Sequence, residues 1–228
     1  MRKILMHLRL IVLPALMCTV ASMAQPYVKA DHLSYSVVYD YKTMNPAVVT
    51  YDLIDSDFKG SISSRPRYFK ADVLLPPPHR KSTDFKYSGY ERGHLCPSGH
   101  RDSRKDWFKD TFVTSNVLLM WPQTNAGAWK DLELLERRHA VSGHRLKCAA
   151  GPVLMDCDTI MNGTKTLLVP RYLFKVLQCS KCTGGVQVYV IPNTNRYHAY
   201  RDCSITINGL AQLIDPTIFN YIVSWINQ

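Results

Sequence analysis

The side chains best suited to catalysis lie in two short stretches of the sequence, about 30 residues apart. The first, GYERGHLCPSGHR at 89–101, places His94 directly after Gly93 and two residues after Arg92. A neutral histidine is a good general base near pH 7, because its unperturbed pKa is about 6.5. Gly93 predicts a tight backbone turn beside this base, and Arg92 brings positive charge to it.

The second stretch runs from Asn125 to Glu133. Asn125 lies where a helix is predicted to begin, and its side-chain oxygen can cap that helix or bind a hard cation. On an ideal helix eight residues turn by about 800°, so Asn125 and Glu133 share one broad face, about 12 Å apart along the axis. Mg²⁺ suits such a site, because it keeps most of its waters and needs few protein ligands.

These groups match what hydrolysis of a phosphodiester requires at neutral pH. A base must deprotonate water, a cation must stabilise charge on the phosphoryl oxygens, and the leaving oxygen must be protonated or coordinated. Each residue alone has an ordinary alternative: a hydrogen-bonded loop histidine for His94, a helix cap for Asn125 and a solvated helix face for Glu133. Their combination favours a hydrolytic site.

Strand-like segments dominate the elements that must position these residues, and one long helix lies in the middle of the chain. We expect a loose segment over 25–34, two strands over 34–53, an irregular proline-rich stretch over 67–85, a short strand entering a turn over 89–99, a brief helix over 103–112, a strand over 111–120, a helix over 124–143, strands through most of the second half and short helices over 207–226. Trp129 is expected in the core. This pattern predicts one α+β domain with a mixed, mostly antiparallel sheet.

The N-terminal residues have the order of a secretory signal. Three basic residues within the first nine positions precede an apolar run of 11 residues, and small residues follow. We expect a signal peptide over 1–24, cleavage after Ala24, and a periplasmic or extracellular protein without stable membrane association. A buried N-terminal helix and a lipoprotein attached through Cys18 are the alternatives; Leu16 and Met17 are bulky for a lipoprotein signal.

Six of the seven cysteines remain once the signal is removed. They are Cys96, Cys148, Cys157, Cys179, Cys182 and Cys203. An even number in an exported protein favours disulfides, although six cysteines allow 15 pairings. Cys179 and Cys182 have the spacing of half a zinc site, but no second such pair is present and His198 is isolated, which favours a disulfide or free thiols.

The chain is strongly basic. Its formal charge of +10 falls to +7 without the signal, which carries three basic residues and no acids. Such a surplus suits a polyanionic partner such as DNA or RNA, although a generic soluble surface has the same composition.

Several motifs, in this order, resemble the DNA/RNA non-specific endonuclease family, a branch of the ββα-metal (His-Me finger) nucleases. The motifs are Arg67 with Asp72, Glu91-Arg92-Gly93-His94, Ser115-Asn116, and Asn125-Ala126-Gly127-Ala128-Trp129 through Leu132-Glu133. The resemblance covers roughly Tyr51 to Phe219. It implies a ββα-metal motif within the α+β fold, a lead-in at 25–50 and an endonuclease domain at 51–228.

The resemblance also implies roles for the matched residues. His94 would be the general base, and Asn125 the only direct protein ligand of one Mg²⁺, with Mn²⁺ as a substitute. Glu133 and Asn116 would orient waters around the metal and the local backbone. Arg67 would face the phosphate, a role suited to a planar guanidinium. The 3′-oxygen would leave and the product would carry a 5′-phosphate.

Two features of the chain depart from the family pattern. Glu91 replaces the usual aspartate, which keeps the charge and adds a methylene, and the Pro-Gln that usually follows the Ser-Asn strand closely is displaced to 122–123. Nearby, we expect His100 to be a solvated loop residue and Cys96 to form a disulfide or to pack.

The sequence thus predicts an exported Mg²⁺-dependent nuclease acting on DNA and RNA with little base reading. A catalytically inactive basic binding protein on the same scaffold and a phosphodiesterase acting on another substrate are the alternatives. An inhibitor protein and a homodimer stay open.

Overall fold

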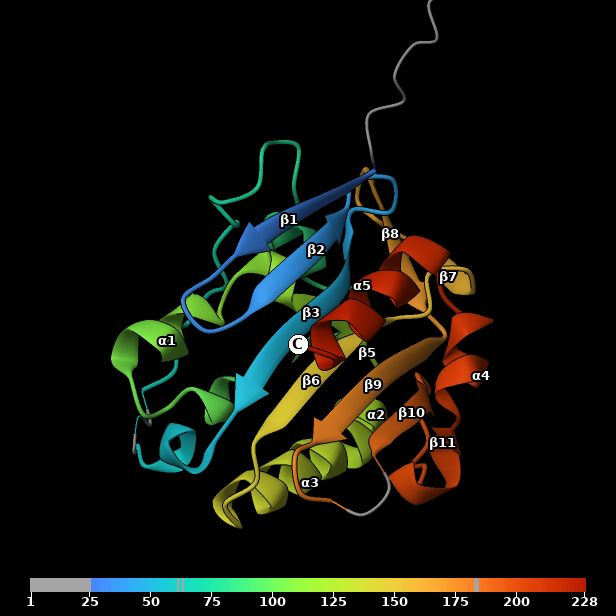
Figure 1. Cartoon of the computed structure of the whole chain (residues 1–228). Helices are drawn as coiled ribbons and strands as arrows, with labels where there is room; N and C mark the ends of the chain where they lie inside the picture. The colour runs from blue at the N-terminus through green and yellow to red at the C-terminus, as the bar shows by residue number, and fades with distance from the viewer. Residues whose placement is uncertain (1–25, 61, 63, 183–184) are drawn as a thin grey trace, which may run out of the picture.

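Seven antiparallel strands form the central sheet of this protein (Figure 1). The computed structural model describes residues 26–60, 62, 64–182 and 185–228, so the expected signal peptide lies outside the described residues. The sheet has the order β1-β2-β3-β6-β9-β10-β11. Its strands are β1 (Tyr27–Asp31), β2 (Ser36–Asp40), β3 (Asn45–Leu53), β6 (Leu146–Pro152), β9 (Tyr172–Cys179), β10 (Val186–Pro192) and β11 (Ser204–Ile205).

The expected loose segment over 25–34 contains strand β1, which pairs in register with β2 from Tyr27↔Asp40 to Asp31↔Ser36. Only Ala30 of β1 is buried, so the strand lacks the hydrophobic alternation by which a strand is recognised from sequence. The two strands expected over 34–53 are confirmed as β2 and β3. The sheet therefore begins well before residue 51.

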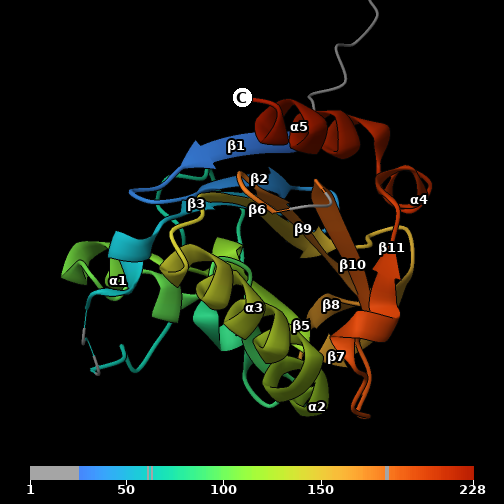
Figure 2. The same cartoon turned by 60° about the horizontal axis from the view of Figure 1, so that its bottom comes forward.

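Both faces of the sheet are covered, as Figure 2 shows. Helices α4 (Ile207–Ala211) and α5 (Pro216–Ile226) pack on one face, where α5 buries Ile218, Ile222 and Ile226 at the four-residue spacing of one helix stripe. The ββα unit covers the other face. Because strands in the middle of the sheet are covered twice, β3 is buried along almost its whole length rather than on alternate residues.

The ββα unit consists of two short strands followed by a helix. Strand β4 (Glu91–His94) pairs antiparallel with β5 (Val117–Met120), and the chain then enters α2 (Pro122–Thr124), a π-helical segment (Asn125–Trp129) and α3 (Lys130–Val141). The strand expected over 111–120 begins only at Val117, because 114–116 form a 3₁₀ turn. The predicted α+β fold and its mostly antiparallel sheet are confirmed.

The remaining elements lie around this unit. They are α1 (Lys105–Asp110), the hairpin of β7 (Cys157–Asn162) and β8 (Lys165–Pro170), and 3₁₀ turns at Asp55–Phe58, Ser82–Phe85, Ser98–His100 and Tyr200–Cys203. Among the described residues, every helix is too short or too polar to cross a bilayer.

Candidate active site

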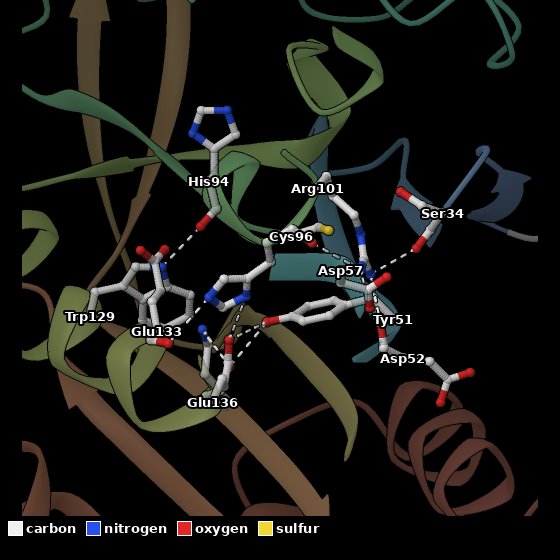
Figure 3. A network of polar contacts seen from close by, with 12 residues as sticks. Ser34, Tyr51, Asp52, Asp57, His94, Cys96, Arg101, Trp129, Glu133 and Glu136 are labelled. Carbon is white, nitrogen blue, oxygen red and sulfur yellow. Dashed lines mark hydrogen bonds and ion pairs between the residues drawn. The ribbon is translucent and has the colours of Figure 1, made fainter. Parts of the chain in front are cut away.

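His94 ends strand β4, and its backbone is fixed by the helix of the same unit. The Trp129 indole nitrogen donates a hydrogen bond of 2.9 Å to the His94 carbonyl oxygen, so the expected core residue also positions the expected base. The imidazole points away from this contact (Figure 3) and packs against the rings of Phe69 and Phe112, at centroid distances of 5.1 and 4.9 Å. Its Nε2 atom is buried and has no hydrogen-bond partner among the described residues.

The surroundings of His94 favour its neutral form. Burial, followed by the positive charges of Arg65 and Arg92, lowers the pKa of His94 to about 3. The imidazole is therefore neutral at pH 7, with an unpartnered nitrogen that can accept a proton. This is the protonation state that a general base requires.

Asn125 is oriented by the residue that departs from the family pattern. Its Nδ2 atom lies 2.7 Å from Glu91 Oε2, across the space between β4 and the helix. An ionised carboxylate only accepts hydrogen bonds, so the amide nitrogen must be the atom that faces Glu91. The amide oxygen Oδ1 is consequently turned away from Glu91 and remains available to a cation.

The helix that carries Asn125 is not regular. Asn125 to Trp129 form a π-helical segment in which Gly127 has the non-helical angles φ −101° and ψ −114°. A Cβ on Gly127 would lie 3.0 Å from a ring carbon of Tyr197, so a larger residue would press on that ring. The ideal-helix angle between Asn125 and Glu133 therefore does not apply across this segment. π-segments of this kind are frequent at functional sites.

Two adjoining cavities nevertheless bring the expected residues together. A cavity of about 520 Å³ is lined by Arg65, Pro66, Arg67, Phe69, Phe85, Lys86, Tyr87, Tyr90, Glu91, Arg92, His94, Phe112 and Asn125. A second, of about 280 Å³, is lined by Arg65, His94, Pro97, Ser98, Gly99, Asn125, Ala126, Lys130 and Glu133. A larger cavity of about 590 Å³ lies elsewhere, lined by residues such as His32 and Asp106, and none of the expected site residues reaches it.

The donors around these cavities fit a hard divalent cation. The Asn125 amide oxygen and the carboxylates of Glu91 and Glu133 are oxygen ligands of the kind that Mg²⁺ prefers. Burial raises the pKa of Glu133, while the positive charges of Lys175, His100 and Arg65 oppose that rise. A bound cation would favour the ionised form of Glu133 further.

Of the two roles expected for Asn116, orienting waters and orienting the local backbone, its contacts fit only the second. Its side chain is fully buried and lines neither of the two cavities, so it is not placed to orient waters there. Its Oδ1 accepts from the Cys96 backbone nitrogen at 2.9 Å, and its Nδ2 donates to the Cys96 and Thr111 carbonyls at 3.0 Å each. Asn116 thus fixes the backbone directly after His94.

Gly93 and Arg92 are also explained by packing. Gly93 lies in strand β4 and does not make the expected tight turn; a Cβ there would lie 2.1 Å from Met120 Sδ, which is itself fully buried on the paired strand. The Arg92 guanidinium lies 4.8 Å from the Phe69 ring centroid and donates to Ser82 Oγ at 3.2 Å. This places its charge on the cavity wall.

Arg65 is a cationic residue of the site that sequence reasoning missed. Arg67 lines the larger of the two site cavities, whereas Arg65 lines both and acts on the pKa of both His94 and Glu133. The family motif pairs Arg67 with Asp72, but Asp72 is buried and hydrogen-bonded to Ser115 and His32. The sequence signal that could have pointed to Arg65 is its position two residues before Arg67, in Arg65-Pro66-Arg67.

His100 differs from its expected environment, whereas Cys96 takes one of its two expected roles. His100 is buried rather than solvated: its Nε2 donates to the Glu133 carbonyl at 3.2 Å, and its Nδ1 lies 3.2 Å from Glu136 Oε2. Cys96 is fully buried and is not in a disulfide. Burial raises the pKa of its thiol to about 11, which leaves it a packing residue rather than a nucleophile.

A buried polar network lies under the helix (Figure 3), and the sequence offered no signal for it. The Glu136 carboxylate accepts a hydrogen bond of 3.1 Å from the Tyr51 hydroxyl and lies 2.8 Å from Lys175 Nζ. The side chains of Glu136 and Lys175 are both fully buried. Burial alone would raise the pKa of Glu136, but Lys175 and His100 lower it to about 2. Through His100, this network is tied to the backbone of Glu133.

Comparison with known proteins assigns this chain to a family. The model of the DNA/RNA non-specific endonuclease family matches residues 20–222. Human Endonuclease G, mitochondrial, is 31% identical over 173 residues, which are 70% of this chain and 58% of the relative. Nuclease EXOG, mitochondrial, of Danio rerio is 26% identical over 177 residues, or 71% and 51% of the two chains. The chain thus spans just over half the length of these curated relatives.

A solved structure shows the same fold. The EndoG/EndoGI complex, solved to describe EndoG inhibition, matches with a TM-score of 0.65 and 21% identity, over 81% of this chain and 82% of that one. The family match extends over most of the chain and includes the strand of His94 and the helix of Asn125 and Glu133. This chain belongs to the DNA/RNA non-specific endonuclease family.

Proposed function

We propose that this chain is an exported, Mg²⁺-dependent endonuclease that hydrolyses phosphodiester bonds of DNA and RNA and leaves 5′-phosphates. The observation that carries the proposal is the neutral His94, whose buried and unpartnered Nε2 lies at cavities shared with Asn125 and several cations. Family membership supports the nuclease class, and the oxygen donors support a hard metal.

In this mechanism His94 Nε2 accepts a proton from the attacking water. The new bond forms between the water oxygen and phosphorus, the bond to the 3′-oxygen breaks, and the phosphate remains on the 5′ side. Arg65 and Arg67 offset the phosphate charge from the cavity wall. Asn125 Oδ1 would hold Mg²⁺ as its only direct protein ligand, and Glu133 would orient waters around it; the ion would supply positive charge to the phosphoryl and leaving oxygens.

The cavity wall favours recognition of the backbone over recognition of bases. Cationic side chains at Arg65, Arg67, Lys86 and Arg92 line the larger site cavity, and the net charge of +7 that remains after removal of the signal attracts any polyphosphate. Contacts of this kind position a nucleic acid without reading its sequence. Cleavage should therefore weaken steeply as salt rises.

Export is supported by the signal-like N-terminus and by the Cys179–Cys182 disulfide. The relatives named above are mitochondrial, so the compartment of this chain is a separate question. Fractionation of the producing cells, with the mature N-terminus sequenced, tests it; a protein that keeps residues 1–24 would contradict export. The EndoG/EndoGI complex describes an inhibitor of EndoG, and an inhibitor of this chain stays a prediction.

The activity is tested with plasmid DNA and RNA, in Mg²⁺ and in EDTA. We expect cleavage only with the metal, and His94→Ala to lower the rate by roughly 10²–10⁴-fold. His79→Ala, which changes a half-buried histidine outside both site cavities, is the matched control and should keep full activity. Product ends should accept kinase labelling only after phosphatase treatment, as 5′-phosphates do.

Two results would contradict the mechanism: cleavage in EDTA, or full activity of His94→Ala. If neither polymer were cleaved but both were bound, the inactive basic binding protein would be the better description.

A further inference from the structure

Four metal-ligating side chains gather at one edge of the fold, outside the candidate active site. They are His139, His144, Cys179 and Cys182, and one ligand atom from each lies within 4.8 Å of the ligand atoms of the others. His144 Nδ1 lies 3.1 Å from Cys179 Sγ and 3.3 Å from Cys182 Sγ. His139 Nδ1 lies 3.4 Å from Cys182 Sγ. Both imidazoles therefore aim a nitrogen at the same sulfur pair.

The backbone, rather than the four side chains, brings these residues together. His139 lies in the last turn of α3, His144 precedes β6, Cys179 ends β9, and Cys182 follows in the next loop. The β6–β9 ladder pairs Leu146 with Cys179. The strand ladder and the helix end thus fix the cluster independently of any ligand.

Two more backbone hydrogen bonds close this corner. The His144 nitrogen donates to the His139 carbonyl at 3.3 Å, and the Ser180 nitrogen donates to the Arg145 carbonyl at 3.0 Å. Gly143, with φ +80°, allows the chain to reverse between the two histidines. These backbone contacts therefore hold the two histidine side chains next to the two cysteine side chains.

The ligand set matches zinc chemistry. Zn²⁺ takes four tetrahedral ligands, with Zn–S about 2.3 Å and Zn–N about 2.0–2.1 Å, so nitrogen and sulfur ligands lie roughly 3.5 Å apart. The observed nitrogen–sulfur distances of 3.1, 3.3 and 3.4 Å are close to this. The spacings Cys-x₂-Cys and His-x₄-His are both within the range of structural zinc sites. The second pair of ligands consists of His139 and His144 rather than of two further cysteines.

The structure joins Cys179 and Cys182 in a disulfide, which is one of the two states expected of these cysteines from the sequence. A disulfide alone, however, gives no reason for two imidazole nitrogens to face its sulfur atoms. We propose that His139, His144, Cys179 and Cys182 form a Cys₂His₂ structural zinc site when the two cysteines are reduced, and that the disulfide is the oxidised form of the same corner.

The chemistry of the two forms balances. Zn²⁺ binding to the dithiol releases two thiol protons to solvent and transfers no electrons. Conversion of the disulfide to the dithiol takes two electrons and two protons, which a dithiol reductant supplies as it becomes a disulfide. The imidazoles bind as neutral ligands.

The site would fasten the end of α3 to the sheet. His139 is six residues after Glu133, about 9 Å along the helix axis, so a metal at this corner would hold the helix that also carries a candidate catalytic carboxylate. The site is separate from the oxygen donors of the proposed nuclease centre, and it does not depend on the proposed activity.

The test uses the full chain, reduced with a dithiol reductant, stripped with a chelator and titrated with Zn²⁺ in excess Mg²⁺. We expect one tightly bound Zn²⁺ per chain, and Co²⁺ in its place should give the absorption bands of tetrahedral thiolate ligation. The double variant His139→Ala/His144→Ala and the single variant Cys182→Ser should bind Zn²⁺ about 100-fold more weakly or worse. Cys157→Ser and Cys203→Ser, at half-buried free cysteines elsewhere, are matched controls and should bind as the wild type does.

A second measurement needs no variant. Alkylation followed by peptide mapping should show Cys179 and Cys182 protected by Zn²⁺ in the reduced protein, and Cys157 and Cys203 reacting equally with and without it. The proposal is overturned if the reduced wild type binds no Zn²⁺, if the histidine double variant binds as tightly as the wild type, or if Zn²⁺ does not protect the two cysteines.

Discussion

The buried pair of Glu136 and Lys175 under the candidate site should contribute strongly to the stability of the fold. Replacing Glu136 by glutamine keeps the shape and the hydrogen bond from Tyr51 but leaves the Lys175 charge without its partner, 2.8 Å away, in a site with no solvent exposure. Removing one member of a buried pair typically costs about 3–5 kcal/mol, because the remaining charge is desolvated and uncompensated. We expect Glu136→Gln to lose this much free energy of unfolding.

The pKa of Glu136 shows how this stabilisation depends on pH. It falls from its ordinary 4.5 to about 2 in the folded chain. A fall of roughly 2.5 pH units corresponds to about 3 kcal/mol. Because the folded pKa lies below the unfolded one, this stabilisation is present above pH 4.5 and is lost as the pH falls from 4.5 toward 2.

Urea unfolding at pH 7, followed by tryptophan fluorescence, measures the loss. Asp55→Asn is the matched control, since it breaks an exposed ion pair of 2.8 Å with Lys59 and should cost at most about 1 kcal/mol. The double variant Glu136→Leu/Lys175→Met should recover much of the loss, because it removes both charges. The reasoning fails if Glu136→Gln costs no more than Asp55→Asn, or if the gap between wild type and Glu136→Gln does not narrow as the pH drops below 4.5.

Three further predictions concern the candidate site. Because the pKa of His94 is lowered to about 3, kcat/KM should show no loss centred near pH 6.5; a break there in the pH profile would mean that His94 titrates normally. Arg65→Ala should lower kcat/KM about tenfold or more, and Arg67→Ala should lower it less, because of these two arginines only Arg65 lines both cavities. Assays of the two variants on a short DNA duplex compare these losses. A larger loss for Arg67→Ala would make Arg67 the main phosphate contact. Asn116→Ala should cost roughly 3 kcal/mol in urea unfolding, about one for each of its three backbone hydrogen bonds, and a neutral result would show that the loop after His94 is held otherwise.

Local pattern was enough to predict the elements that carry the site. His94 at the end of a strand and Asn125 at the start of a long helix follow from motif, periodicity and turn residues within windows of a few residues. Strand β1 was missed because it buries a single side chain and owes its form to its pairing with β2. A strand of that kind is specified by its partner rather than by its own sequence.

The contacts that tune the site could not be predicted, because they join distant segments. The hydrogen bond from Asn125 to Glu91 spans 34 positions, and that from Tyr51 to Glu136 spans 85. In the proposed zinc site, each histidine lies 35 to 43 positions away from the two cysteines. A single sequence shows which of these side chains are able to bind, but only the folded chain shows which of them meet.

The two faces of the helix unit hold opposite electrostatic environments. On the cavity side His94 is buried beside Arg65 and Arg92, so its neutral form is favoured. Beneath the helix Glu136 is fully buried, but Lys175 and His100 lower the pKa of its carboxyl, so it stays ionised. The buried pair therefore holds the helix in place, while the neutral form of His94 rests on burial, Arg65 and Arg92, so Glu136→Gln should unfold the protein more readily without raising the pKa of His94.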